Sequence, residues 1–326
     1  MQTVAQGQET IQRILLAYAP HLANCREAVR RELADAPLGT VLSDYVEGGK
    51  MLRALLVFLS ASALGGDPED AMPGAAAIEL LHGAALVHDD IIDDACTRRG
   101  KAALHVALGT GRALVLGDYL ILRSIETVAR ARSPRALEAV ALLSRYAQEC
   151  CRGQIEDLDA ILGNPEQSYL SIIRGKTAAP FVAAVTLGGL LVQTSLGGLD
   201  VLCTYALNLG MAFQIHDDHL DLKGDETDMG KPVGQSLANG RPLLHLIYLE
   251  RYGSPAAVRS YRQLCSGGLP RRALVEILEQ ERIFERVSDV AARYRDVAVE
   301  SLHALESSRH IDELTAMAYY VTSRST

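Results

Sequence analysis

The apolar residues of this chain recur mostly at helical spacing. The first such segment, residues 9–34, places its apolar side chains on one face of a helix, at Ile11, Ile14, Leu15, Tyr18 and Leu22. The same period continues along most of the sequence, whereas strand-like alternation and β-branched runs bounded by turn residues are rare. The pattern therefore predicts an all-α fold.

Turn-forming residues divide the pattern into separate helices. Breaks are predicted at Gly65-Gly66-Asp67-Pro68, Ser133-Pro134, Gly163-Asn164-Pro165 and Gly197-Gly198. Helices are predicted at residues 9–34, 50–64, 70–94, 111–131, 134–162, 166–192, 199–223, 240–252, 269–307 and 310–324. Residues 253–309 are richer in charge, so we interpret them as outer helices with a solvated face.

Composition narrows the class of protein. The 326 residues are 48% hydrophobic, which is ample for a core, and no low-complexity linker divides them, so we predict a single domain over residues 1–326. The formal net charge of −8 argues against a nucleic-acid surface. Six cysteines form no CxxC motif, and the apolar run 178–192 is short and broken by Pro180. We expect a cytoplasmic protein with reduced thiols and no membrane span.

Two clusters of carboxylates follow apolar runs. The first is His88-Asp89-Asp90-Ile91-Ile92-Asp93-Asp94, in which a helix would crowd Asp89, Asp90 and Asp93 onto one face. The second is Asp217-Asp218-His219-Leu220-Asp221. Such crowding is unfavourable unless a cation relieves it, and carboxylate oxygens favour a hard cation such as Mg²⁺. Two facing clusters would hold a polyanion through divalent metals.

Two other interpretations of these clusters stay open at this stage. Each cluster could be a solvated acidic helix end, although carboxylates are seldom left beside a core unpaired. A di-iron bundle would need Glu-x-x-His pairs on facing helices. His216 and His219 flank the second cluster, but the first has no histidine in the required position.

Basic residues lie near both clusters. Gly48-Gly49-Lys50-Met51-Leu52-Arg53 precedes an apolar helix, a position that suits an anion. Arg98 and Arg99 follow the first cluster, and Lys231 follows the second. Lys176 stands four residues before Pro180, so the helix should be distorted at Lys176-Thr177. Carboxylates, metals and cations in alternation indicate a site for diphosphate groups.

The ordered motifs resemble those of the trans-isoprenyl diphosphate synthases, a family of head-to-tail prenyltransferases. The resemblance covers roughly residues 45–250 and rests on GGKMLR (48–53), LLHGAALVHDDIIDDACTRRGK (80–101), GDYL (117–120), GQIEDL (153–158), GKTAAPF (175–181), FQIHDDHLD (213–221) and GKPVGQSL (230–237). It implies an orthogonal helical bundle around a deep central cavity, a homodimer, and condensation of isopentenyl diphosphate with an allylic diphosphate to an all-trans polyprenyl diphosphate.

The same resemblance implies roles for individual residues. The ligands of three Mg²⁺ on the allylic diphosphate would be Asp89, Asp90, Asp93, Asp217 and Asp221, with Asp218 beside them. Contacts to that diphosphate would come from Arg98, Lys176, Thr177 and Lys231. The isopentenyl diphosphate site would comprise Lys50, Arg53, His82 and Arg99, and the reacting carbons would be lined by Phe213 and Gln214.

Several positions depart from the family pattern. Ala102 and His245 stand where proline is common, and Ser236 stands where an acidic residue is common. A terpene cyclase on the same fold would carry an Asn/Ser/Glu motif in place of Asp217-Asp218 and no isopentenyl site. A non-catalytic subunit of a heteromeric synthase would have eroded aspartates, and these are intact.

Product length should depend on the helix before the first cluster. A helical turn rises about 5.4 Å, close to the length of an isoprene unit, so a growing tail would pass Ala85 and Ala84 and then Leu81. Short-chain relatives tend to carry aromatic side chains at the two alanine positions. Their absence favours geranylgeranyl diphosphate or longer over the farnesyl product of a short-chain synthase. A floor from another helix is the alternative, with Tyr119, Leu122 or Arg123 as candidates.

Overall fold

The protein is helical throughout in a computed structural model that describes residues 4–161, 165–192, 197–224, 237, 241–267 and 270–323. The first half contains α1 (Val4–Ala17), α2 (Ala19–Leu33), α3 (Gly39–Val46), α4 (Leu52–Ala63), the short η1 (Pro68–Ala71), α5 (Met72–Ile92), α6 (Leu104–Leu108), α7 (Thr110–Ala129) and α8 (Ala136–Asp159). Two short strands, β1 (Thr97–Arg98) and β2 (Lys101–Ala102), pair as an antiparallel hairpin. The predicted all-α class is confirmed.

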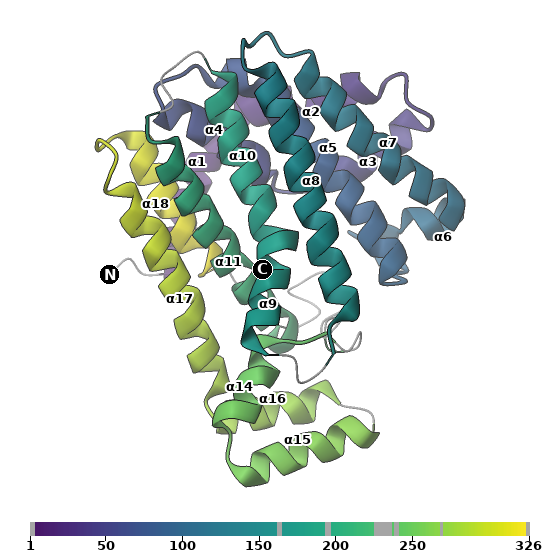
Figure 1. The fold of residues 1–326 in the computed structure, drawn as a ribbon, viewed down its shortest axis with the longest axis vertical. Coiled ribbons are helices and arrows are strands. Elements are labelled where there is room, and N and C mark those ends of the chain that lie inside the picture. Colours follow the sequence, from purple (N-terminus) through teal and green to yellow (C-terminus); the bar gives the residue numbers. More distant parts are fainter. Residues whose placement is uncertain are drawn as a thin grey trace.

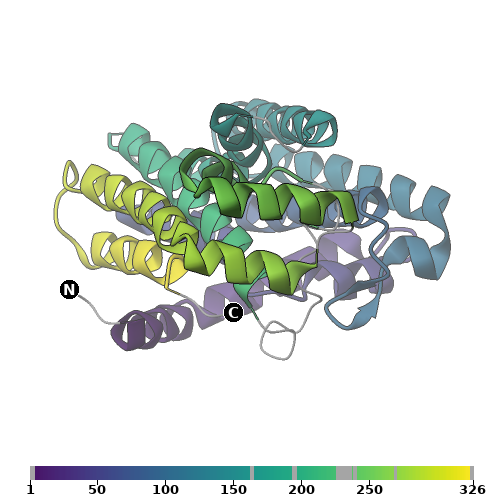
Figure 2. The ribbon, with the colours of Figure 1, turned by 90° about the horizontal axis from the view of Figure 1, so that it is seen from below.

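The second half continues the bundle. It contains α9 (Glu166–Ile173), η2 (Arg174–Ala178), α10 (Ala179–Leu191), α11 (Leu199–Lys223), α14 (Leu244–Tyr252), α15 (Pro255–Gly267), α16 (Arg271–Gln280), α17 (Ile283–Leu302) and α18 (Arg309–Val321). In Figure 1, α14, α15 and α16 lie at one end of the molecule. Seen from that end, in Figure 2, α1 and α2 lie on one side of the bundle and α8 on the other.

Helix α10 is the centre of the main core. Its residues are apolar or small on every side, and nearly all are buried. It packs against α4, α5, α8 and α11, the helices that carry most of the predicted site residues. A second apolar cluster joins α11 to α14, α16 and α17. The bundle therefore surrounds its most apolar helix with the elements that carry the chemistry.

The helix boundaries correct the sequence prediction in several places. Residues 9–34 form two helices because the chain breaks at Tyr18, just before Pro20. Residues 269–307 are interrupted at Arg282, whose φ of 55° is left-handed. Helices α3, α6 and α15 and the β1–β2 hairpin were not predicted. Helix α17 is no mere outer helix, since it packs closely along α11 with a buried apolar face.

One segment, Glu166–Leu191, is long and apolar enough by composition to cross a membrane. It corresponds to α9, η2 and α10, and 67% of its most apolar window is buried inside the protein. Burial of this extent is typical of a helix at the centre of a helical bundle.

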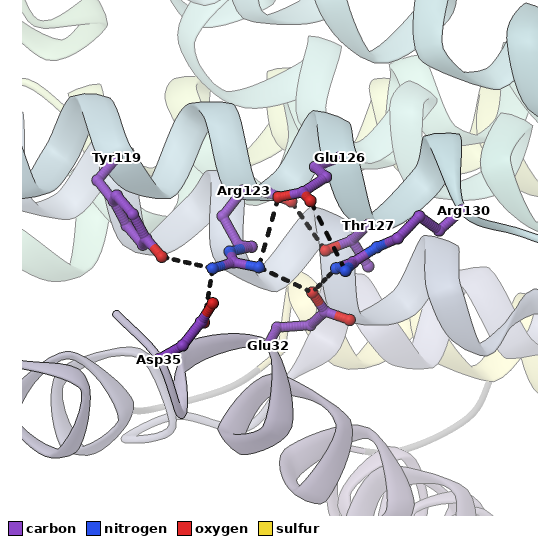
Figure 3. A network of polar contacts seen from close by, with 7 residues as sticks. All are labelled: Glu32, Asp35, Tyr119, Arg123, Glu126, Thr127 and Arg130. Atoms are coloured by element: carbon purple, nitrogen blue, oxygen red, sulfur yellow. Dashed lines mark hydrogen bonds and ion pairs between the residues drawn. The ribbon is translucent and has the colours of Figure 1, made fainter. Parts of the chain in front are cut away.

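A polar network joins α2 to α7 far from the carboxylate clusters (Figure 3). Arg123 donates to Asp35 and to the Tyr119 hydroxyl, each at 2.6 Å, and Glu32 accepts from Arg130. The neighbouring Leu122 is 67% exposed. Within one chain, therefore, Leu122 points outward and Arg123 is held by Asp35 and Tyr119, and the alternative that α7 supplies the floor of the product tunnel stays a prediction.

Candidate active site

The first carboxylate cluster ends α5, and two of its members face basic side chains. Asp93 accepts a charged hydrogen bond from Arg241, and Arg241 Nε lies 3.4 Å from Asp157 Oδ2. Asp157 in turn accepts from Lys176 Nζ at 2.6 Å. Burial raises the pKa of Asp89, and the neighbouring Asp93 adds to this, while Lys176 acts in the opposite direction. The arrangement concentrates alternating charges at one end of α5.

Asp90 points elsewhere, which corrects the expectation that three carboxylates share one face. Its side chain is 1% exposed and accepts hydrogen bonds from the Tyr45 hydroxyl at 2.6 Å and from Arg98 Nε at 3.0 Å. Helical geometry explains the difference, because residues four apart share a face whereas neighbours are turned by about 100°. Asp89 and Asp93 thus form the open pair, and Asp90 is held inside.

The second cluster also contains one buried aspartate. Asp218 accepts from the Tyr169 hydroxyl and from Gln214 Nε2, both at 2.7 Å. Burial raises the pKa of Asp218 to about 7, although both hydrogen bonds oppose the rise. Asp217 is partly exposed beside it, and Asp221, one turn further, is 6% exposed.

The turn that carries Lys176 and Thr177 lies between the two clusters. Lys176 reaches Asp157 on α8, and the Thr177 hydroxyl donates to Gln214 Oε1 on α11 at 2.7 Å. The distortion expected ahead of Pro180 is confirmed as a π-helical turn over Arg174–Ala178. Gly153 and Gly210 allow the close approach: an added Cβ would lie 2.9 Å from Lys176 N and 2.5 Å from Ala178 Cα, respectively.

A separate basic group forms at the start of α4. Arg99, in a left-handed conformation with φ 51°, donates to the Tyr45 carbonyl at 3.1 Å and lies over the glycine loop. A Cβ at Gly48 would come within 2.7 Å of Arg99 Nη1, so the glycines admit the guanidinium. The structure therefore brings Arg99 to the segment that carries Lys50 and Arg53.

Buried residues support this basic group. Glu79 on α5 accepts from the Ala54 amide at 2.9 Å, so a carboxylate caps the first turn of α4, which has no side-chain cap of its own. Burial lowers the pKa of Arg53, and the charge of Glu79 opposes that effect. Burial, and then the neighbouring arginines, hold the pKa of His82 well below its usual range, which favours the neutral imidazole.

Two phenylalanines connect the basic group to the second cluster. The Arg53 guanidinium lies over the Phe181 ring at 5.3 Å, and the Phe181 and Phe213 centroids are also 5.3 Å apart. Phe213 immediately precedes Gln214, which binds Asp218. Two aromatic rings thus lie between the basic group and the second carboxylate cluster. An apolar space between polar groups is the environment that a reactive carbon intermediate needs.

A cavity of about 700 Å³ lies against the outer side of the π-helical turn. Its lining includes Tyr146, Arg174 and Leu207, but none of the residues predicted for the site. We therefore place the candidate site by its converging polar groups rather than by this cavity.

The carboxylates suit a hard cation that also binds a ligand. Within the described ranges, no three His, Cys, Asp or Glu side chains form a metal site by themselves. Mg²⁺ usually binds proteins through one or two carboxylates, with water and substrate phosphates completing the octahedron. The open pair Asp89 and Asp93 and the partly exposed Asp217 provide that kind of incomplete ligation.

The remaining predicted residues lie outside the described ranges or apart from the carboxylates and the basic group. Lys231 and Ser236 lie outside the described residues. Of the chain-length residues, Ala84 is 1% exposed within the core, Ala85 is exposed and Leu81 is partly buried. His245 is fully buried between His219 and Phe284, with ring centroids 5.5 and 5.3 Å away and with neither ring nitrogen hydrogen-bonded.

Sequence reasoning missed several residues that the structure brings to the site, namely Tyr45, Glu79, Asp157, Tyr169, Phe181 and Arg241. Asp157 and Phe181 stood inside motifs already singled out, so those motifs contained the signal. Tyr45 and Tyr169 carried none, because each lies over 40 residues from the aspartate it binds, 45 for Tyr45 and 49 for Tyr169.

Comparisons with known proteins agree with this geometry. Residues 35–268 match the model of a family described as polyprenyl synthetase. The chain is 37% identical, over 91% of its length and 94% of the relative's, to a short chain isoprenyl diphosphate synthase of Methanothermobacter thermautotrophicus. It is 30% identical to the octaprenyl diphosphate synthase of Escherichia coli, over 94% of this chain and 96% of the relative.

A solved structure is similar along its whole length. The polyprenyl synthase from Caulobacter crescentus, crystallised with calcium and isoprenyl diphosphate, superposes with a TM-score of 0.88 at 27% identity. The match covers 97% of this chain and 98% of that one.

Proposed function

The chain belongs to the polyprenyl synthetase family, and on this premise we propose that it condenses isopentenyl diphosphate with an allylic diphosphate to give an all-trans polyprenyl diphosphate. One observation carries the proposal: the Lys176–Thr177 turn lies between two aspartate clusters, while a second basic group is separated from it by Phe181 and Phe213. Two diphosphate sites with an apolar gap between them suit a head-to-tail condensation, with residues 1–326 acting as one domain.

We assign the allylic diphosphate to the carboxylate side. Asp89, Asp93, Asp217 and Asp221 would hold Mg²⁺, three ions as the family resemblance implies, whereas Asp90 would support Asp89 from within. When bound, Mg²⁺ supplies positive charge that lets the diphosphate leave. Lys176 and Arg98 would contact the diphosphate oxygens directly, with Lys231 assigned from the sequence. Asp218 would support Asp217 from within.

The second diphosphate belongs to Lys50, Arg53, His82 and Arg99. These residues would orient isopentenyl diphosphate so that its double bond faces C1 of the allylic substrate. The allylic C–O bond breaks, a C–C bond forms, and a proton leaves the resulting cation. No side chain need accept that proton, because an oxygen of the departing diphosphate can. Phe181 and Phe213 exclude water from the cation.

The direct test is turnover. Purified protein would be incubated with Mg²⁺, isopentenyl diphosphate and, in separate reactions, dimethylallyl, geranyl or farnesyl diphosphate, and the products would be sized by chromatography. We expect consumption of isopentenyl diphosphate and release of inorganic diphosphate. Cyclic hydrocarbon formed without isopentenyl diphosphate would instead indicate a terpene cyclase.

We propose a product of geranylgeranyl length or longer, set by α5. Ala85 has room for a larger side chain because it is exposed, whereas Ala84 is packed in the core. Ala85→Phe should therefore shorten the main product without stopping allylic ionisation, and Leu81→Ala should lengthen it if Leu81 forms the floor. A wild-type product that stops at farnesyl diphosphate, or an unchanged distribution in Ala85→Phe, would contradict this assignment.

We also propose a cytoplasmic homodimer built on α7 and α8. These adjacent helices expose large apolar side chains: Val115 is 64% exposed, Leu122 67%, Ile155 60% and Leu158 62%. A second copy that covered these side chains would bury them. The cysteines described, five in number, are free, which fits a reducing compartment. Leu122→Glu should shift the mass in light scattering from dimer to monomer.

A further inference from the structure

The C-terminal helix contacts the segment assigned to isopentenyl diphosphate. The Tyr320 hydroxyl on α18 accepts a hydrogen bond from Lys50 Nζ at 3.1 Å, and the ammonium lies 5.8 Å from the centre of the Tyr320 ring. The two residues are 270 positions apart in the sequence, and Tyr320 is 7% exposed. A nearly buried hydroxyl thus reaches an exposed lysine at the edge of the site.

Lys50 lies outside the regular helices. It lies between α3 and α4 in an irregular segment that contains Gly48 and Gly49, and it is exposed. Ordering an exposed lysine side chain costs rotamer entropy. A partner that restricts Lys50 before substrate arrives would reduce the cost of binding.

Tyr320, in contrast, stands on a well-anchored helix. The Tyr205 hydroxyl on α11 donates to the Leu314 carbonyl at 2.6 Å, and Ser308 caps the first turn of α18. Near that end of the helix, Glu313 accepts from Arg309 at 2.8 Å and from the Tyr18 hydroxyl at 3.4 Å. Contacts with α1, α4, α11 and α17 complete the anchoring of α18.

We propose that Tyr320 is a positioning residue for substrate diphosphate binding: its hydroxyl and ring orient the Lys50 ammonium toward the isopentenyl diphosphate. This inference rests on the proposed function, because it assigns a supporting residue to the same basic group. It gives the C-terminal helix a role in the isopentenyl diphosphate site.

The test is Tyr320→Phe, which keeps the ring over the ammonium and removes the hydroxyl. The KM for isopentenyl diphosphate should rise about fivefold, the size expected when one hydrogen bond of typical net strength is lost. The kcat and the KM for the allylic substrate should change less than twofold. Tyr319→Phe is the matched control, because Tyr319 adjoins Tyr320 in the sequence but places its ring over Arg295. It should behave as wild type.

A double-mutant cycle separates positioning from folding. In a Lys50→Met background, Tyr320→Phe should have no further effect on the KM for isopentenyl diphosphate. Equal effects in both backgrounds, a parallel loss for both substrates, or a fall in KM in Tyr320→Phe would each overturn the inference. If wild-type protein does not consume isopentenyl diphosphate at all, the proposed function itself is wrong. That outcome is distinct from a failure of the Tyr320 inference, in which the wild type is active but the variants do not behave as expected.

Discussion

The two aspartate clusters hold their buried members in related but unequal ways. Asp90 and Asp218 each follow an open aspartate, and each accepts a hydrogen bond from a tyrosine, Tyr45 at 2.6 Å and Tyr169 at 2.7 Å. The other partner differs, because Asp90 is paired with Arg98 and Asp218 with the neutral Gln214. Within the described residues, the buried aspartate therefore has a formal cation as a partner in the first cluster and neutral partners in the second.

The difference between the partners of Asp90 and Asp218 indicates which aspartate depends more on charge from a bound ligand. Around the first cluster the chain supplies Arg98, Lys176 and Arg241, so its carboxylates are partly compensated before any ligand binds. The buried carboxyl of the second cluster is not compensated by its neutral partners, and burial raises the pKa of Asp218 to about 7. We infer that metal and diphosphate stabilise the Asp218 carboxylate more than the Asp90 carboxylate.

The largest effects should come from removing an open aspartate from either cluster. Asp89→Ala and Asp217→Ala should each lower kcat by about 100-fold to 1000-fold, because each removes a metal ligand at a site that water can fill. Melting temperatures should stay close to wild type, and chelation of Mg²⁺ should reproduce the loss. Near-normal turnover in either variant would remove the metal assignment of its cluster.

A second pair of variants separates the carboxylate side from the basic group. Lys176→Ala should lower kcat about 100-fold, because the leaving diphosphate loses a direct cation. Arg53→Ala should instead raise the KM for isopentenyl diphosphate about tenfold or more, with allylic binding preserved. Rapid-quench measurement of allylic ionisation and titration of each substrate would check both. If both variants changed the same parameter, the two sites would not be distinct.

The sequence allowed much of this arrangement to be predicted. Helical periodicity gave the fold class, and Pro180 correctly located the distortion at Lys176, because both are local effects. The break at Arg282 was missed because its left-handed conformation occurs at a residue type that gives no turn signal. Helix α3 and the β1–β2 hairpin are short, so their periodicity was too brief to recognise.

The site was harder to predict where its contacts are tertiary. Local spacing suggested that Asp89, Asp90 and Asp93 act together. It could not show that Asp90 accepts hydrogen bonds from Tyr45 and Arg98. The capping of α4 by Glu79 likewise depends on how two helices pack, not on either sequence alone. The predicted roles of the site residues themselves remain predictions that the variants above would test.

A smaller effect should distinguish the two buried aspartates. Tyr45→Phe and Tyr169→Phe remove equivalent hydroxyls, but Asp90 keeps Arg98 whereas Asp218 keeps only Gln214. The Mg²⁺ concentration for half-maximal activity should rise about tenfold in Tyr169→Phe, where no cation remains on the carboxylate, and about threefold in Tyr45→Phe, where Arg98 remains. Equal shifts, or a larger shift in Tyr45→Phe, would show that Arg98 makes no difference.

His245 on α14 packs against His219 of the second cluster, where it should affect stability rather than turnover. Burial, and then the nearby His219, hold the pKa of His245 well below its usual value. The unfolded chain binds this proton near pH 6.5 and the folded chain does not, so acidification below that pH should reduce the free energy of unfolding by up to about 1.4 kcal/mol per pH unit. His245→Leu should remove this contribution and also two buried ring nitrogens without hydrogen bonds.

The measurement is urea unfolding from pH 8 to pH 5, with chelator present so that metal binding does not contribute. The free energy of unfolding of His245→Leu should exceed that of wild type by an amount that grows below about pH 6.5. Parallel curves would mean that His245 can be protonated in the folded protein. The difference between the surroundings of Asp90 and Asp218 would then not extend to His245.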